Sequence, residues 1–288
     1  MRCFVETWSE RGTVMGIYTD LRWTLWARPS EFEKADIAFI QKDYYKDWCE
    51  RRKKAGSQVS LNQLPHVTKW IVDKANLARL IAGQDYCPDT FIDKSEGQLQ
   101  GIWVQKPSDG GRGLDINFLR DPSDWGKPGY VLQRYLDTPY LIDGRKFDIR
   151  VMAKVDDKGR LHLHREGLIR CASLPFDEES LDPLIHNSNC GFQKRMGKRQ
   201  KSFTLLSKTE FADEAIPQID TILNDVWRLL REQDVFQGSN DFELLGIDFL
   251  VDESKKVWLL EINDYPGWHS FRSSMGRFYL ASLGSLFK

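Results

Sequence analysis

The sequence has no excess of charge, no cysteine pattern and no long apolar run, and each absence excludes a class of protein. Its 41 basic and 42 acidic residues leave a net charge of −1, which predicts no general attraction to nucleic acid or to an acidic membrane. No signal peptide or apolar stretch of transmembrane length is visible, so we expect a cytoplasmic protein. The five cysteines are scattered without a CxxC pair, which predicts free thiols in a reducing compartment rather than disulfides or a zinc site: Cys3, Cys49, Cys87, Cys171 and Cys190.

Apolar and aromatic residues, in contrast, are plentiful. A hydrophobic content of 41% over 288 residues predicts a globular protein of one large domain or two to three smaller lobes. Helical patterns cover residues 30–56, 69–82 and 209–233. The stretch 173–202 lacks periodicity and predicts a long loop. Strand patterns, which make the expected fold α+β, cover 101–106 and 130–136 and form two hairpins, 146–155 with 161–170 and 244–251 with 257–262.

The second hairpin is the most informative segment. Side chains alternate faces along a strand, so Glu261 and Asn263 share one face, and the polar turn places Asp248 opposite Glu261. Two facing carboxylates repel each other unless a cation lies between them, and hard oxygen ligands of this kind are typical of Mg²⁺. A metal–nucleotide site is one interpretation. Two carboxylates on a solvated sheet edge are the alternative, and the hairpin alone favours neither.

A glycine-rich loop follows the strand that ends at Lys106. Gly110, Gly111 and Gly113 would let backbone N–H groups approach phosphate oxygens, and Lys106 and Arg112 would add positive charge. The loop is not a Walker A motif, because no Gly-Lys-Ser/Thr sequence closes it and no strong helix pattern follows. Most glycine-rich loops are ordinary turns, so this one indicates a phosphate site only in combination with other motifs.

The first hairpin carries alternating charges. Lys146, Asp148 and Arg150 share one strand face, where Asp148 would lie between two cations and orient both. Arg170 lies on the partner strand, and arginine binds carboxylate and phosphate groups through two parallel hydrogen bonds. The cluster therefore suits an anionic substrate. An exposed, salt-bridged sheet face would give the same pattern.

Two polar residues in the irregular stretch are further candidates. His186 could act as a general base, although a lone loop histidine is usually neither catalytic nor a ligand. Asn189 could supply an oxygen near a metal or phosphates. No Ser/His/Asp or Cys/His arrangement indicates nucleophilic hydrolysis.

Together and in this order, these segments resemble the tubulin tyrosine ligase-like family of ATP-grasp amino-acid ligases. The resemblance extends from about Asn62 to Pro266, and several motifs in sequence are far more specific than any one of them. The motifs are Lys74-Ala75-Asn76-Leu77, Pro88-Asp89-Thr90-Phe91, Lys106 with its glycine loop, Gln133-Arg134-Tyr135-Leu136, residues 145–150, residues 165–173 and the hairpin through Pro266.

The resemblance implies an α+β ATP-grasp fold with an N-terminal lobe (1–60), a central lobe with the phosphate loop (61–132) and a C-terminal lobe with the metal site (133–288), and a nucleotide between two sheets. It implies a monomeric ligase that uses ATP and Mg²⁺ to join a free amino acid to a protein carboxylate, without nucleic acid or membrane. It assigns catalysis to Lys146, Asp148, Arg150 and Arg170, nucleotide binding to Lys74, Lys106, Gly110, Gly111, Arg112, Gly113, Gln133, Tyr135, Leu136 and Asn189, and Mg²⁺ to Asp248, Glu261 and Asn263.

The chain departs from the family pattern in three places. Asp115 stands where the family loop usually has its last glycine, residues 186–189 read His-Asn-Ser-Asn instead of His-Leu-Thr-Asn, and residues 264–268 replace a motif that often has small residues around Ser-Pro. The chain ends soon after, so we expect it to lack the C-terminal extensions that many relatives use for microtubule contact.

The resemblance leaves the substrates open. Glutamate is the favoured amino acid and tyrosine the second, with a tubulin tail as a candidate acceptor and the cytoskeleton as a candidate location. One alternative is a catalytically inactive relative that binds a nucleotide or a cytoskeletal partner. Another is an ATP-grasp ligase that acts on a small molecule or on a protein other than tubulin.

Overall fold

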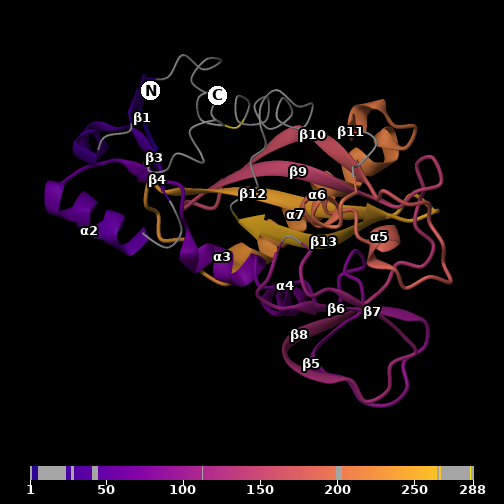
Figure 1. Cartoon of the computed structure of the whole chain (residues 1–288). Helices are drawn as coiled ribbons and strands as arrows, with labels where there is room; N and C mark the ends of the chain where they lie inside the picture. The colour runs from indigo at the N-terminus through magenta and orange to yellow at the C-terminus, as the bar shows by residue number, and fades with distance from the viewer. Residues whose placement is uncertain are drawn as a thin grey trace.

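The computed structural model describes residues 2–5, 24–26, 29–40, 45–111, 113–198, 203–264, 266 and 286. Within these ranges the strands form three sheets, and helices pack between and beside them (Figure 1). The mixture of helices and sheets confirms the α+β prediction. No helix in the described part of the chain combines the length and apolarity needed to cross a bilayer. All five cysteines are free, as predicted.

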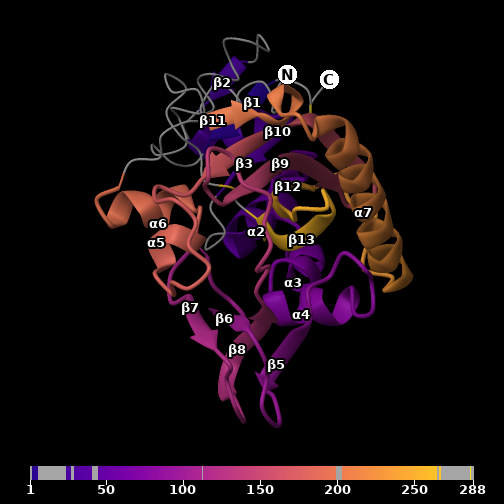
Figure 2. The same ribbon diagram turned by 90° about the vertical axis from the view of Figure 1, so that its right-hand side faces the viewer.

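The largest sheet is antiparallel and carries most of the core. The strand face with Phe147, Ile149 and Val151 is buried and belongs to the same core as helix α7 (Ala212–Glu232), which lies along the sheet in Figure 2. Both predicted hairpins and the helix over 209–233 are thereby confirmed. The strands, in order across the sheet, are β11 (Phe203–Leu205), β10 (Leu161–Cys171), β9 (Phe147–Asp156), β12 (Phe242–Val251) and β13 (Val257–Asp264).

A smaller antiparallel sheet faces the large one, with helices α3 (Pro65–Ile71) and α4 (Lys74–Leu80) beside it. The prediction of one helix over 69–82 is wrong, because Asp73 starts a second helix: its side chain accepts a hydrogen bond from the Asn76 amide at 2.9 Å. The expected strand at 101–106 is present, and the one expected at 130–136 begins earlier, at Gly126, and ends at Arg134. In order the strands are β5 (Thr90–Lys94), β8 (Gly126–Arg134), β6 (Ile102–Pro107) and β7 (Asn117–Arg120).

The third sheet is parallel and lies near the N-terminus. Among the described residues, the helix predicted over 30–56 is present only over residues 45–55, because residues 37–39 form a fully buried strand that pairs with β1. Ring contacts among Phe4, Phe32 and Trp48, with centroids 4.4–5.4 Å apart, hold the surrounding elements together. The elements are β1 (Arg2–Val5), β2 (Thr24–Trp26), η1 (Pro29–Lys34), β3 (Ile37–Phe39), α2 (Tyr45–Ala55) and β4 (Ser60–Leu61).

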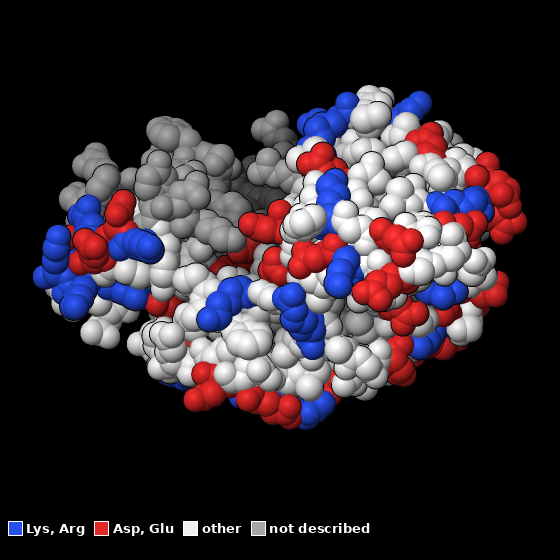
Figure 3. Space-filling model, turned by 90° about the horizontal axis from the view of Figure 1, so that it is seen from below, with Lys and Arg blue, Asp and Glu red and all other residues white. Residues whose placement is uncertain are grey.

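The basic end of α2 links this sheet to the large one. Lys and Arg side chains gather at the α2 end of the face in Figure 3, and those in the last turn of α2 suit the negative end of the helix dipole. Arg52 binds both carboxylate oxygens of Asp241, at the start of β12, and the Leu61 amide donates to the same carboxylate at 2.9 Å. One buried acid therefore fastens the N-terminal elements to the central sheet.

The stretch 173–202, expected to be irregular, contains two short helices in its described part: α5 (Pro183–His186) and α6 (Cys190–Arg195). Gln193 holds them together, because its buried amide donates to the carbonyls of Leu184 at 3.0 Å and Asn187 at 2.6 Å. A 3-10 turn, η3 (Leu206–Lys208), follows β11.

Candidate active site

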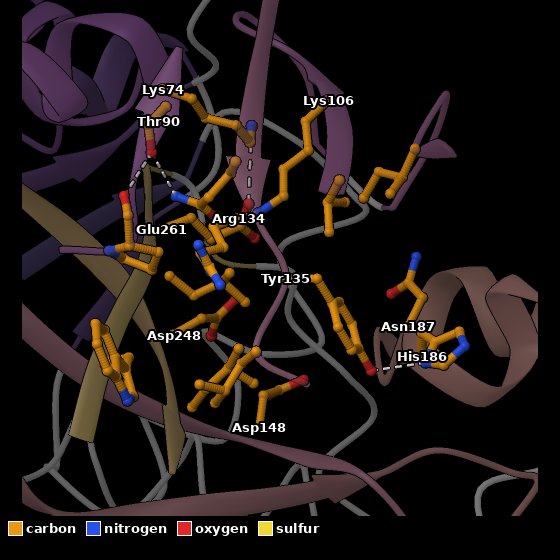
Figure 4. A pocket seen from close by; sticks show the side chains of 18 of the residues that line it. Lys74, Thr90, Lys106, Arg134, Tyr135, Asp148, His186, Asn187, Asp248 and Glu261 are labelled. Carbon is orange, nitrogen blue, oxygen red and sulfur yellow. Dashed lines mark hydrogen bonds and ion pairs between the residues drawn. The ribbon is translucent and has the colours of Figure 1, made fainter. Parts of the chain in front are cut away.

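A cavity of about 780 Å³ lies between the small and the large sheet. Strands β6 and β8 supply one wall, strands β9, β10, β12 and β13 supply the other, and α4 and residues 186–189 add to both. Figure 4 shows side chains from both sheets directed into the same space. Its size is typical of a small-molecule site, and neither sheet forms it alone.

Two lysines bring positive charge to the side formed by the small sheet. Lys106, on β6, is only 6% exposed and donates to the Gln133 side-chain oxygen at 2.7 Å. Burial lowers its pKa to about 8; nearby Lys74 adds to the lowering, and Glu261 opposes it. Lys74, the first residue of α4, donates to the carbonyl of Gly110, and its Nζ lies 3.7 Å from the Glu261 carboxylate. The glycine loop is thus tied to α4.

A third lysine lies deeper. Lys146 directly precedes β9, is 3% exposed, and places its Nζ 3.6 Å from the centroid of the Tyr135 ring. Burial lowers its pKa well below the ordinary value; Lys106 adds to the lowering, while Asp148 opposes it. The ring face replaces part of the hydration that the ammonium loses. Two buried ammonium groups with weakened proton affinity form a site prepared for an anion.

The β12–β13 register places Asp248 opposite Glu261, as the sequence predicts. The Asn263 amide donates to Asp248 at 3.4 Å and to Glu261 at 3.1 Å, so the three side chains converge. The described residues contain no group of three His, Cys, Asp or Glu arranged around a common point. A half-turn of the Asn263 amide would complete an all-oxygen set, which fits a Mg²⁺ ion that keeps water or phosphate as its other ligands.

Four buried charges form a network beside these carboxylates. Arg150 binds Asp248 through Nε and Nη2, and Arg170 donates to Asp148 at 2.5 Å and lies 3.0 Å from Asp248. Burial opposes the ionised form of Asp248, but the two guanidinium groups outweigh it and hold its pKa at about 2. Burial raises the pKa of Asp148, which Arg170 and the Ser188 hydroxyl partly offset.

This network differs from the predicted arrangement, in which Asp148 lies between two cations of its own strand. Strand β9 runs between β10 and β12, and its register pairs Asp148 with Arg170 on one side and Arg150 with Asp248 on the other. Cross-strand neighbours are closer than residues two apart on one strand, so the ion pairs run across the sheet. Arg170 reaches the cavity wall, whereas Arg150 is not among the described residues that line it.

The glycine loop closes over one end of the cavity, which Gly110, Gly111 and Gly113 all line. Gly113 has a φ of +67°, a conformation that favours glycine, and a Cβ there would lie 2.7 Å from the Asn187 side chain, which would have to shift. Asp115 has a φ of 52°, the left-handed conformation that favours glycine. This aspartate therefore takes the backbone shape that a glycine usually provides, and aspartate tolerates it better than most residues.

The other predicted nucleotide residues are more scattered. Gln133 donates to the Thr90 hydroxyl at 3.2 Å, and Leu136 lines the cavity just beyond β8. Asn189 also lines it, but its side-chain oxygen caps helix α6 by accepting from the amides of Gly191 and Phe192. Arg112 lies outside the described residues.

Comparison with known proteins matches the sequence of this chain to one family. The model of the tubulin-tyrosine ligase family matches residues 42–279, most of the chain. The chain belongs to the tubulin-tyrosine ligase family. The match includes every predicted site residue.

Several curated relatives are similar at about 30% identity. A probable tubulin polyglutamylase of Caenorhabditis elegans is 30% identical over 57% of this chain and 46% of its own length. A protein monoglycylase of Mus musculus is 29% identical over 63% of this chain and 25% of its own. A tubulin monoglutamylase of Homo sapiens is 31% identical over 64% of this chain and 19% of its own. The matched region thus spans less than half of each of these relatives.

Within this member of the tubulin-tyrosine ligase family, an apolar part of the cavity escaped sequence reasoning. Leu250, Trp258 and Leu260 line this part, and the polar Ser188, which donates to Asp148, lines the cavity elsewhere. Because side chains alternate along β12, Leu250 lies on the same strand face as Asp248. The sequence of the hairpin therefore could have predicted that Leu250 lines the cavity. The family motif at 186–189 includes Ser188, but the sequence does not indicate its contact with Asp148, which depends on how the 173–202 segment folds back.

Proposed function

We propose that this chain is an ATP- and Mg²⁺-dependent ligase that joins an amino acid to a protein carboxylate through an acyl-phosphate. Family membership supports a ligase that modifies proteins. The observation that carries the proposal is the opposition, across one cavity, of buried Lys106 on the small sheet and the Asp248–Glu261 pair on the large sheet, with buried Lys146 at the start of β9. Such a pair of surfaces suits a metal–polyphosphate complex, because the lysines compensate the negative charge of phosphates and the carboxylates compensate the positive charge of the metal ion.

The residues fall into positions that suit ATP. Lys74, Lys106 and Lys146 would contact phosphate oxygens beneath the glycine loop, which already touches Lys74. Leu136 and the apolar wall would receive the adenine. Mg²⁺, held by Asp248, Glu261 and Asn263, would offset negative charge on the transferring phosphate.

The reaction that we propose has two steps. An oxygen of the acceptor carboxylate attacks the γ-phosphorus, the bond to the ADP oxygen breaks, and an acyl-phosphate forms. The amine of the amino acid then attacks the acyl carbon; an amide forms, inorganic phosphate leaves and one proton is released. Lys106 and Lys146 stabilise charge in the first step by their position rather than by proton transfer. The cavity needs no nucleophilic side chain for this chemistry.

Arg170 is the residue that we assign to the amino-acid carboxylate. It lines the cavity, and its five N–H donors allow it to hold a substrate carboxylate while it stays bound to Asp148. Arg150 then has a supporting part: it neutralises Asp248 and fixes the orientation of that carboxylate. Binding the carboxylate in this way places the amine for attack.

Glutamate is the amino acid that the relatives favour. Those reported above are named as glutamylases and a glycylase, and the names include no tyrosine-adding enzyme. Tubulin is the acceptor that the nematode and human names give. The direct test is incubation of the chain with Mg-ATP, tubulin and single amino acids, followed by intact-mass analysis of tubulin. We expect a mass increase with glutamate; no addition with any amino acid, on tubulin or on other acidic proteins, would refute the proposal.

A substitution tests the metal assignment. Glu261→Gln keeps the shape of the side chain but removes one charge from the proposed Mg²⁺ set, so we expect amino-acid-dependent ADP release to fall by about 100-fold or more. Glu232→Gln is the matched control, because Glu232 lies at the exposed end of α7 and pairs only with Arg228 among the described residues. Full turnover of Glu261→Gln would show that the metal site lies elsewhere.

A further inference from the structure

His186 has both ring nitrogens engaged. Its Nε2 lies 2.8 Å from the Ser180 carbonyl oxygen, which can only accept, so Nε2 carries a proton. Its Nδ1 lies 2.7 Å from the Tyr135 hydroxyl, as the dashed line in Figure 4 shows. In the neutral ring, Nδ1 therefore accepts from Tyr135. A histidine with this arrangement has no free lone pair with which to take a proton from a substrate.

The surroundings of His186 favour this neutral form. The side chain is 5% exposed and packs against Phe118 and Phe176, whose ring centroids lie 4.9 and 5.9 Å away. Burial lowers its pKa, and the nearby Lys146 ammonium adds to the lowering, whereas the Ser180 carbonyl, Asp182 and Asp177 oppose it. The position of the His186 ring is thus fixed by two hydrogen bonds and two aromatic neighbours.

The hydrogen bond acts on Tyr135, and Tyr135 acts on Lys146. Tyr135 directly follows β8, is 5% exposed, and contacts His186 through its hydroxyl and Lys146 through its ring face. No hydrogen bond or ion pair to the Lys146 ammonium is present among the described residues. The ring face is therefore the direct contact that positions this buried cation before a substrate binds, while Asp148 and Asp137 attract it without a hydrogen bond.

We propose that His186 is a positioning residue: through its hydrogen bond it orients Tyr135, whose ring holds the Lys146 ammonium where it meets an anionic oxygen of the bound nucleotide. This inference rests on the proposed nucleotide site. The His186–Tyr135 hydrogen bond links α5 to the end of β8, which would flank the nucleotide. It also gives a role to His186, which the sequence suggested only as a general base. A general base would instead require Nδ1 or Nε2 to be available in the cavity.

The test uses five variants of the full chain: four single substitutions and the double variant Tyr135→Phe/His186→Gln. Tyr135→Phe removes the hydroxyl and keeps the ring. His186→Gln places an amide near Nε2 and loses the acceptor for Tyr135, whereas His186→Asn places an amide oxygen near Nδ1 and retains an acceptor. Tyr86→Phe is the matched control: Tyr86 is also buried and donates to a carboxylate, that of Asp225 at 2.7 Å, but does not line the cavity.

The measurement is the dissociation constant of the β,γ-imido analogue of ATP with Mg²⁺, together with the thermal midpoint of each variant. We expect Tyr135→Phe and His186→Gln each to weaken binding by about 5- to 30-fold, the effect of one buried hydrogen bond. The double variant should bind no more weakly than either single one, because both remove the same bond. His186→Asn should recover most of the affinity, and Tyr86→Phe should bind like the wild type.

Two failures can be told apart. If the wild type does not bind the analogue, the proposed function fails, and this inference fails with it. If the wild type binds and Tyr135→Phe and His186→Gln bind equally well, the inference alone is refuted. Equal losses in His186→Asn and His186→Gln, or additive losses in the double variant, would also refute it. If a histidine variant does not fold, Tyr135→Phe, the most conservative change, decides the question.

Discussion

Replacing Lys106 by methionine should stabilise the nucleotide-free protein while it abolishes activity. The pKa of Lys106 falls from 10.5 to about 8 because the ammonium is buried, which corresponds to a cost of about 3 kcal/mol at neutral pH. Lys106→Met removes this cost but leaves the Gln133 side-chain oxygen without its 2.7 Å donor, a loss of about 1 kcal/mol. The net gain is about 2 kcal/mol, or a rise of about 4–8 °C in the thermal midpoint.

The sign of the pH dependence makes this prediction specific. Below pH 8 the lysine is charged in both the folded and the unfolded chain, and the folded chain bears the whole cost. Between about pH 8 and 10.5 the unfolded chain binds more protons, so the wild type gains stability as the pH rises and the advantage of Lys106→Met disappears. Thermal or urea unfolding of both proteins across this range measures the difference directly.

The matched control is Lys94→Met, because the Lys94 side chain is 74% exposed. It should show neither the gain at neutral pH nor the change with pH. Saturating Mg²⁺ and ATP analogue should raise the thermal midpoint of the wild type and leave that of Lys106→Met unchanged. A Lys106→Met protein that is less stable than the wild type at pH 7, or a difference that does not shrink towards pH 10.5, would refute the reasoning.

Four further substitutions test packing, ion pairing and backbone conformation. Gly167→Ala should destabilise the fold by about 1–3 kcal/mol in urea, because the new Cβ would lie 2.8 Å from Ile149 Cγ2; unchanged stability would contradict the described β9–β10 packing. Asp241→Asn should cost about 3 kcal/mol in the same assay, because it leaves the Arg52 guanidinium without its buried counter-charge. Asp115→Val should lower the thermal midpoint by an amount equivalent to about 1–3 kcal/mol, whereas Asp115→Gly should be tolerated, since φ is 52°; equal midpoints would contradict that conformation.

The hairpins could be predicted from sequence because their information is local. Alternation along β12 and β13 and a short polar turn are enough to place Asp248 opposite Glu261. Helix α7 could be predicted for the same reason, since its stripe of apolar residues depends only on spacing within one helix.

Features that depend on residues far apart in the sequence were missed or predicted wrongly. Residues 37–39 form a strand because β1 and β4 lie on either side of them, and within 30–56 nothing distinguishes that apolar run from one side of a helix. The pairing of Asp148 with Arg170 depends on β9 lying between two other strands. The break between α3 and α4 was missed for a different reason. Asp73 caps the start of α4, and a prediction from hydrophobic periodicity alone does not take such capping residues into account.

The neutral network of two arginines and two aspartates limits how this site can change by mutation. Loss of Asp148, Arg150, Arg170 or Asp248 alone leaves a buried charge without its partner, at a cost of several kcal/mol, a large part of the stability of a typical protein. A lineage that no longer needed catalysis could not discard the four one at a time, so they would outlast the activity. The buried lysines are different, because Lys106 weakens the fold that contains it. Their retention in a family member is therefore the better sign that selection still acts on the reaction.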